Sequence, residues 1–159
     1  MLSRLGARQL YTFAAVRVRE WVLPSTIRYL KPVGGPPGRE GLIVGCDDGM
    51  VCRIFIDNPF HVPLVQHHAA VRCLDLSMER DKLAVVDEHS VVSVYELATA
   101  SKLFEEQNAE AVAWNTELPD MLCFSAHGTL SIKTGNFPLH QQKMEVSRRE
   151  SIPWTQPPY

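Results

Sequence analysis

The chain has 159 residues, of which 45% are hydrophobic and 21% are charged, and its formal net charge is −2. This balance supplies enough apolar residues for one folded domain and excludes an intrinsically disordered chain. Lysine and arginine together number 16, against 18 aspartates and glutamates, so no binding to nucleic acid through bulk positive charge is expected. No apolar run is long enough for a membrane-spanning helix, so no transmembrane segment is predicted.

The first element in chain order is residues 1–20, in which four arginines precede the first acidic residue, Glu20. An arginine-rich, acid-poor start is typical of mitochondrial import signals. The run from Tyr11 to Val18 is also rich in β-branched and aromatic residues, which favours a strand. We interpret residues 1–20 as an N-terminal segment with a strand of a preceding structural unit, and mitochondrial import is the alternative.

From residue 21 onward the sequence repeats with a period of about forty residues. In each copy an apolar strand leads through a short polar turn into a second apolar strand, which is the signal of a β-hairpin. Shorter apolar runs flank every hairpin, so each copy contains four predicted strands. The hairpins begin at Leu42, Leu83 and Leu122. Their predicted turns are 47–49, 87–90 and 126–128.

This period and strand count are typical of WD40 propeller blades. We therefore predict an all-β fold, a partial WD40-type β-propeller of about three four-stranded antiparallel blades. A complete propeller needs at least four blades, so the chain would be either part of a larger propeller or an open arc with exposed edges. A β-sandwich whose hairpins recur by chance is the alternative. The predicted blades are 21–65, 66–107 and 108–143.

Other segments complete the predicted layout. Residues 33–40 are rich in glycine and proline and predict a loop between the first two strands of the first blade. Residues 144–159 are polar and proline-rich and predict a disordered tail. Residues 74–76 and 113–115 have the pattern of inner strands of successive blades. The residues predicted to be buried between blades are Leu42, Val44, Leu74, Leu76, Leu83, Val85, Val94, Tyr95, Trp114 and Leu122.

The individual WD40 hallmarks are degraded. The Gly-His pair before the first strand of a blade survives only as Gln66-His67, and the Trp-Asp pair that closes the third strand is replaced in all three units. These losses argue against the usual His–Ser–Asp–Trp hydrogen-bond network, although they leave the period intact. The replacing pairs are Phe55-Ile56, Tyr95-Glu96 and Lys133-Thr134.

Six runs carry a resemblance that goes beyond the repeat. They are 21–23, 34–42, 70–75, 82–88, 112–116 and 120–125. These runs resemble the WD-repeat subunits of intraflagellar transport complex A, and the similarity covers about residues 16–143. The resemblance implies a piece of the second of two tandem propellers in a large ciliary protein. It also implies a truncated or isoform-like product, since the family pattern is lost after about Lys143.

The resemblance implies a non-catalytic propeller scaffold that acts through protein–protein contacts in retrograde ciliary transport, cilium assembly and ciliary cargo entry. Its implied partners are the other subunits of complex A and adaptors for ciliary membrane cargo. Its implied location is the cytoplasm, the cilium and the ciliary basal body. The alternative function is a small mitochondrial or cytosolic β-rich enzyme unrelated to WD40 proteins. The residues that would bind partners stay unassigned.

Several sequence features offer chemically active groups, yet each has a structural explanation. The adjacent His67 and His68 have metal-binding side chains, but neighbours on a strand point to opposite faces. Residues 47–49 resemble the start of a calcium loop whose remaining ligands are missing. Residues 87–90 are interpreted as a solvated turn. The four cysteines match no metal-binding spacing and are expected to be reduced, buried thiols. We predict no catalytic, cofactor-binding or metal-binding residues.

Overall fold

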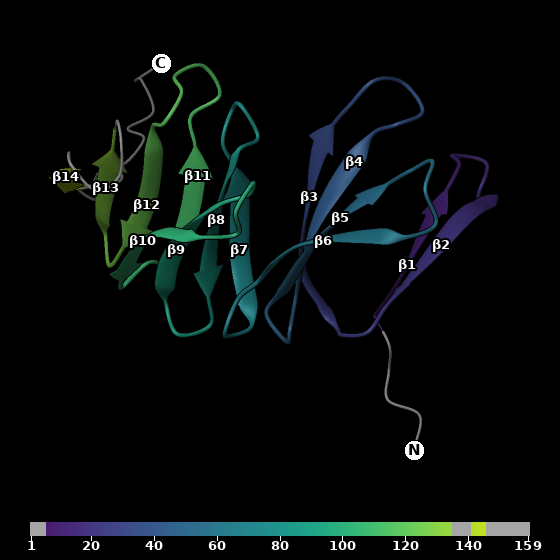
Figure 1. Cartoon of the computed structure of the whole chain (residues 1–159), viewed down its shortest axis with the longest axis horizontal. Coiled ribbons are helices and arrows are strands. Elements are labelled where there is room, and N and C mark those ends of the chain that lie inside the picture. The colour runs from purple at the N-terminus through teal and green to yellow at the C-terminus, as the bar shows by residue number, and fades with distance from the viewer. Residues whose placement is uncertain (1–5, 135–140, 146–159) are drawn as a thin grey trace, which may run out of the picture.

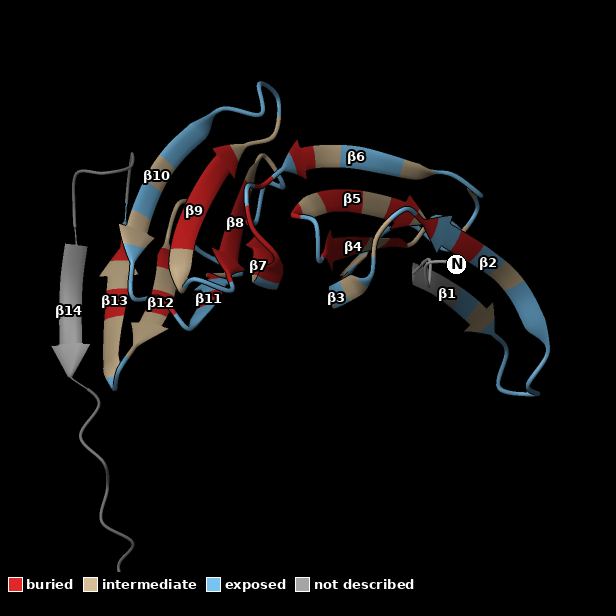
Figure 2. Ribbon diagram, turned by 90° about the horizontal axis from the view of Figure 1, so that it is seen from below, coloured by how far each residue is buried: buried red, intermediate tan, exposed pale blue. Residues whose placement is uncertain are grey.

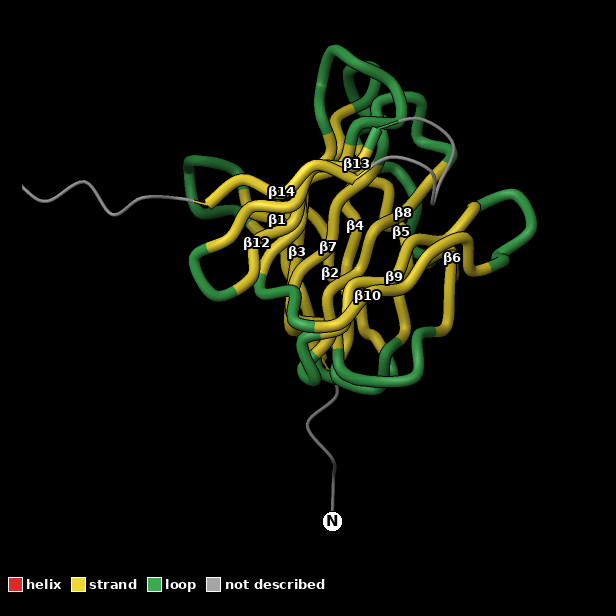
Figure 3. The backbone as a smooth tube through the Cα atoms, turned by 90° about the vertical axis from the view of Figure 1, so that its left-hand side faces the viewer, coloured by secondary structure: helices red, strands yellow, loops and turns green. Residues whose placement is uncertain are grey.

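The structure is a computed structural model that describes residues 6–134 and 141–145. Over these residues every regular element is a β-strand, and the strands are joined by loops and turns (Figure 3). A hairpin of β1 (Gly6–Tyr11) and β2 (Arg17–Leu23) comes first, and three four-stranded sheets follow in chain order (Figure 1). The described residues contain no helix long and apolar enough to cross a membrane.

Each four-stranded sheet is an antiparallel meander whose strands pair in sequence order. The first sheet comprises β3 (Ile27–Gly34), β4 (Gly41–Cys46), β5 (Met50–Phe55) and β6 (His61–Gln66). The second comprises β7 (Val71–Leu76), β8 (Lys82–Asp87), β9 (Val91–Glu96) and β10 (Lys102–Gln107). The third comprises β11 (Ala111–Trp114), β12 (Leu122–Ala126), β13 (Thr129–Lys133) and β14 (Gln141–Glu145).

The first strands of the sheets lie on the inside of the arc. β7 contacts both β3 and β11, which agrees with the inner strands predicted at 74–76 and 113–115. The fourth strands β6 and β10 are largely exposed, whereas β8 and β9 are buried on both faces (Figure 2). A strand that is covered on both faces suits an unbroken apolar run, which explains the weak alternation of polar and apolar residues in β9.

Short turns connect the second and third strands of each sheet. Gly49 has a φ of +83° and Gly128 a φ of +81°, a left-handed conformation that glycine adopts without steric cost. The Asp48 side chain accepts the Met50 amide at 3.0 Å and so stabilises the first of these turns. The connections between second and third strands are 47–49, 88–90 and 127–128, which match the turns predicted at 47–49, 87–90 and 126–128 to within one residue.

Three apolar clusters fill the interfaces between neighbouring sheets. One packs Trp21 and Leu23 of the hairpin against the first sheet. A second joins the first and second sheets around Ile43 and Leu83, and a third joins the second and third sheets. Ile43 and its neighbour Val44 belong to different clusters, because successive side chains of a strand point to opposite faces. The first and the second four-stranded sheets therefore each bury apolar surface against both of their neighbours.

The fold class predicted from the repeat is confirmed, since the described residues form three stacked four-stranded antiparallel sheets. Of the ten residues predicted to be buried, all but Leu42 are buried. Leu42 is only partly buried against the cluster that contains Trp21. The two-stranded hairpin covers less of that face than a four-stranded sheet would, which explains the difference.

Segment boundaries differ from the prediction in several places. The boundary predicted at residue 21 falls inside β2, so residues 21–23 pair with β1 and not with the first four-stranded sheet. β3 continues through Pro32 to Gly34, because proline is tolerated on an edge strand, and the loop predicted at 33–40 starts later. β14 includes two residues of the predicted tail 144–159. The rest of that tail, like residues 1–5 of the N-terminal segment, lies outside the described residues.

Candidate functional site

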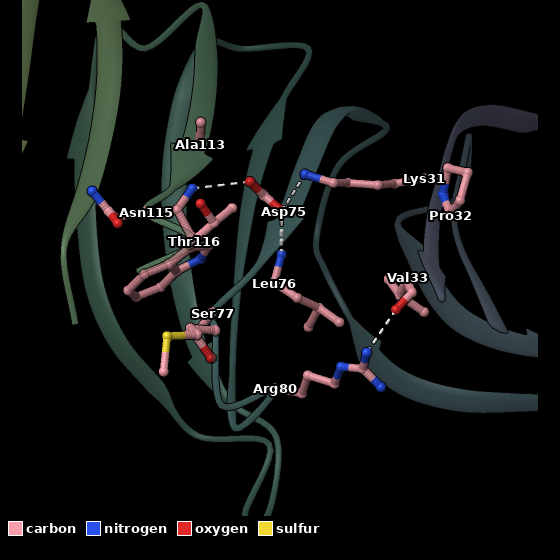
Figure 4. Close-up of a pocket in the computed structure, with 12 residues that line it drawn as sticks. Lys31, Pro32, Val33, Asp75, Leu76, Ser77, Arg80, Ala113, Asn115 and Thr116 are labelled. Atoms are coloured by element: carbon pink, nitrogen blue, oxygen red, sulfur yellow. Dashed lines mark hydrogen bonds and ion pairs between the residues drawn. The ribbon is translucent and has the colours of Figure 1, made fainter. Parts of the chain in front are cut away.

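Asp75 lies near the end of β7, and its side chain links all three four-stranded sheets (Figure 4). One carboxylate oxygen is ion-paired with Lys31 Nζ of β3 and accepts the Leu76 amide at 2.7 Å. The other oxygen accepts the Trp114 amide of β11 at 2.9 Å. Asp75 is only 6% exposed, and an ionised carboxylate needs such partners when it leaves water. The three inner strands are therefore joined at one side chain.

A cleft of about 420 Å³ opens beside Asp75, between the C-terminal ends of the inner strands. Arg80, in the turn after β7, donates from its guanidinium to the Val33 carbonyl at 2.8 Å and so spans the first and second sheets (Figure 4). Met78 in the same turn is 47% exposed. The cleft therefore presents two cationic side chains, those of Lys31 and Arg80, beside an exposed thioether.

The turn after β7 is held in place by its own polar side chains. Ser77 Oγ donates to Asp81 Oδ1 at 2.7 Å and accepts the Lys82 amide at 3.0 Å. The Lys82 ammonium bridges Asp81 at 2.7 Å and Asp120, in the connection between β11 and β12, at 2.8 Å. One wall of the cleft is therefore fixed to both the second and the third sheet.

A second polar cluster lies where the chain passes from β6 to β7. His67 Nδ1 lies 2.7 Å from the Tyr95 hydroxyl, and His67 Nε2 lies 3.0 Å from Asp87 Oδ2. All three residues are buried. Because a carboxylate only accepts hydrogen bonds, the neutral ring donates from Nε2 and accepts from Tyr95 at Nδ1. The other oxygen of Asp87 accepts the His89 and Val91 amides, each at 2.9 Å.

One sequence-based expectation is wrong at this cluster, and a second needs qualification. The side chain of Asp87 has no exposed surface, so it is not part of a solvated turn, as predicted for residues 87–90. The degraded hallmarks argued against the usual His–Ser–Asp–Trp network, and of its four members the hydrogen bonds of the His67 ring contain only a histidine and an aspartate, His67 and Asp87, which Tyr95 joins through its hydroxyl. Tyrosine also carries a polar hydrogen on an aromatic ring, so Tyr95 was the signal in the sequence that His67 could have a buried hydrogen-bond partner.

The protonation states in this cluster follow from burial and hydrogen bonding. Burial is the largest cause that lowers the pKa of His67, so the ring is neutral at neutral pH. For Asp87, burial opposes ionisation, but hydrogen bonds from the Val91 amide and His67 outweigh it and lower the pKa. Burial raises the pKa of the Tyr95 hydroxyl. A neutral imidazole is therefore held between a phenol and a carboxylate.

His68 does not point away from His67, as the prediction for neighbours on a strand required. The two ring centroids lie 4.2 Å apart, because both residues follow the end of β6 at Gln66 and escape the alternation of the strand. His68 Nε2 lies 3.5 Å from Asp87 Oδ2. Three side chains of the kinds that bind metals therefore meet at one point.

The remaining candidates have structural roles. Residues 47–49 form the turn between β4 and β5, in which Asp47 is ion-paired with Arg28 at 3.0 Å. All four cysteines are free thiols. Cys46 and Cys52 are buried, and burial raises their pKa values to about 11 and about 12, so both stay protonated at neutral pH. The other two cysteines, Cys73 and Cys123, are only partly buried, contrary to the expectation that all four would be buried.

A comparison with known protein families identifies the family that has this architecture. Residues 4–147 match the family described as IFT122 second beta-propeller. The chain belongs to this family. The IFT122 propeller is non-catalytic, so the cleft beside Asp75 is a candidate binding surface and not a candidate active site.

Curated relatives and a solved structure agree with the family. Proteins named Intraflagellar transport protein 122 homolog are 54% identical to the chain in Xenopus tropicalis and 53% identical in Danio rerio and Homo sapiens, each over 137 residues. The aligned part covers 86% of this chain but only about 12% of the relatives' length. The crystal structure of RRP9 WD40 repeats matches with a TM-score of 0.58 at 13% identity, covering 88% of this chain and 42% of that chain. That likeness shows the WD40 fold alone.

Proposed function

We propose that the chain acts as a propeller scaffold within intraflagellar transport complex A. The observation that carries the proposal is the family match over residues 4–147, which the identity to IFT122 homologs supports. In this role it contributes to retrograde ciliary transport, cilium assembly and ciliary cargo entry in the cytoplasm, the cilium and the ciliary basal body. Its partners are the other subunits of complex A and adaptors for ciliary membrane cargo.

The cleft beside Asp75 is the surface that we assign to a partner subunit. Its walls come from three sheets that are fixed to one another, and a rigid frame of this kind suits specific recognition by loops. Asp75 is neutralised by Lys31 and two backbone amides, whereas Arg80 and Met78 stay exposed. A partner segment that places an acidic side chain next to an apolar one complements this surface.

Arg80→Glu tests this assignment. Like charges that face each other oppose association, so we expect at least about a tenfold drop in the complex A subunits that co-purify with the chain from ciliated cells. Arg80 has a φ of +59°, and glutamate adopts this conformation no less readily than arginine. The substitution removes the exposed hydrogen bond from Arg80 to the Val33 carbonyl, but the Lys31–Asp75 ion pair still joins the same two sheets. The fold should therefore stay intact, which a circular dichroism spectrum checks.

Arg72→Glu is the matched control. Arg72 is exposed and lies near the opposite end of β7 from Asp75, so the variant has the same change in net charge away from the cleft. It should retain the co-purifying subunits. An equal loss in both variants would contradict the assignment of the cleft. A folded wild-type chain that recovers no complex A subunit would contradict the scaffold function itself.

A further inference from the structure

A further side chain of a metal-binding kind, that of His68, lies beside the hydrogen-bonded cluster of His67, Tyr95 and Asp87. His67 bonds to Tyr95 and Asp87, while His68 turns its Nε2 toward the same Asp87 oxygen at 3.5 Å. The ligand-type atoms of the two histidines and the aspartate all lie within 4.8 Å of one another. We propose that His67, His68 and Asp87 bind one borderline transition-metal ion, of which Zn²⁺ is the model case.

Two of the three separations between the ligand atoms are close to those that such an ion requires. Zn²⁺ takes histidine nitrogen and carboxylate oxygen at about 2.0–2.2 Å in tetrahedral geometry, which holds the ligand atoms about 3.3 Å apart. Asp87 Oδ2 lies 3.0 Å from His67 Nε2 and 3.5 Å from His68 Nε2, so the two separations bracket the required value. The third separation, between the ligand nitrogens of His67 and His68, is bounded only by 4.8 Å, so the His68 ring must move toward His67 to complete the geometry. The side chain of His68 is 55% exposed and has room to move.

The surroundings orient two of the three ligands in advance. Asp87 Oδ1 is held by the His89 and Val91 amides, which leaves Oδ2 directed at the histidines. Tyr95 contacts His67 Nδ1, the ring atom that a second partner usually holds in metal-binding histidines. Metal binding at Nε2 moves the single proton of His67 to Nδ1, which then donates to the Tyr95 oxygen, and the hydroxyl hydrogen of Tyr95 rotates away from the ring. The ring is already neutral at neutral pH, so it loses no net proton.

Access and donor chemistry favour the same class of ion. The side chains of His67 and Asp87 have no exposed surface, so an ion enters past His68 and keeps an open position toward solvent. Two imidazoles and one carboxylate suit Zn²⁺ and its neighbours in the first row, whereas Ca²⁺ and Mg²⁺ require oxygen ligands. The ammonium of Lys102 opposes a cation nearby, but Lys102 is ion-paired with Glu105, which weakens this effect.

His68→Ala tests the site, because this side chain is exposed and its removal should not disturb the fold. The full chain, kept reduced, is titrated with Zn²⁺ alone in competition with a chromogenic chelator. We expect one equivalent of Zn²⁺ to bind the wild type, and the loss of one ligand to weaken binding at least about tenfold. Co²⁺ should give the visible absorption of a tetrahedral nitrogen–oxygen site, which His68→Ala removes.

His89→Ala is the matched control, since His89 is an exposed histidine in the neighbouring turn whose side chain is not in the cluster. This variant should bind Zn²⁺ as the wild type does. Equal affinities for the wild type and His68→Ala would overturn the proposal. So would a wild-type chain that binds no Zn²⁺, or a Co²⁺ spectrum with the intense charge-transfer absorption of cysteine thiolate ligands.

Discussion

Asp75→Ala should lower the free energy of unfolding by about 2–6 kcal/mol, because two buried backbone donors lose their acceptor at about 1–3 kcal/mol each. The substitution deprives the buried Leu76 and Trp114 amides of their acceptor and leaves Lys31 without its carboxylate. Because these contacts come from β3, β7 and β11, the substitution should weaken the packing of the three sheets against one another.

Asp57→Ala is the control for this prediction. Asp57 is ion-paired with Arg39 at 3.1 Å, but both side chains are exposed, and an exposed ion pair contributes at most about 1 kcal/mol. Denaturant titration of the two variants beside the wild type measures both losses. If Asp75→Ala cost no more than Asp57→Ala, Asp75 would not be the link between the sheets.

Gly49→Ala should be comparably damaging, with a cost of about 3–5 kcal/mol from backbone strain and overpacking together. A methyl group at Gly49 would lie 2.1 Å from the carbonyl oxygen of His67 and 2.9 Å from that of Ala69. Both are backbone atoms, so neither can swing aside as a side chain would. The turn would have to move away from the β6–β7 connection, which breaks the hydrogen bond from the His67 amide to the Gly49 carbonyl.

Gly128→Ala separates the two causes of this cost. Gly128 occupies the corresponding turn of the third sheet with nearly the same φ, but a methyl group there meets no atom within 4 Å. Only the left-handed conformation is penalised, at about 1–2 kcal/mol. Thermal denaturation should therefore show a much larger loss for Gly49→Ala. Similar losses for the two variants would mean that the contact between the new methyl group at position 49 and the His67 carbonyl does not lower the stability.

The fold could be predicted because its signals are local. Hairpin turns, apolar strands and their recurrence at about forty residues are all visible in short windows of sequence. The prediction failed where packing between segments far apart in sequence determines the position or the burial of a residue. Trp21 was assigned to the first blade, but it lies in β2 and packs on the first sheet from outside. Leu42 was expected in the core, but the neighbouring hairpin covers it only in part.

The polar sites were harder to predict because their partners are far apart in sequence. Asp75 meets Lys31 and Trp114, which lie 44 and 39 residues away, and no local pattern joins them. The available signal was an aspartate between two leucines in a predicted inner strand, since a buried charge requires partners. At His67, the alternation rule failed because the residue lies just beyond the end of β6.

The central claim is that the cleft beside Asp75 receives a partner subunit, and hydroxyl-radical footprinting of Met78 tests it most directly. Met78 is 47% exposed at the cleft, and Phe60, in the connection between β5 and β6, is 74% exposed away from it. The oxidation of both residues is measured by mass spectrometry in the chain alone and in the chain bound to complex A subunits. Met78 should become severalfold less reactive on binding while Phe60 stays unchanged. Unchanged oxidation of Met78 in a complex that contains the chain would contradict the claim.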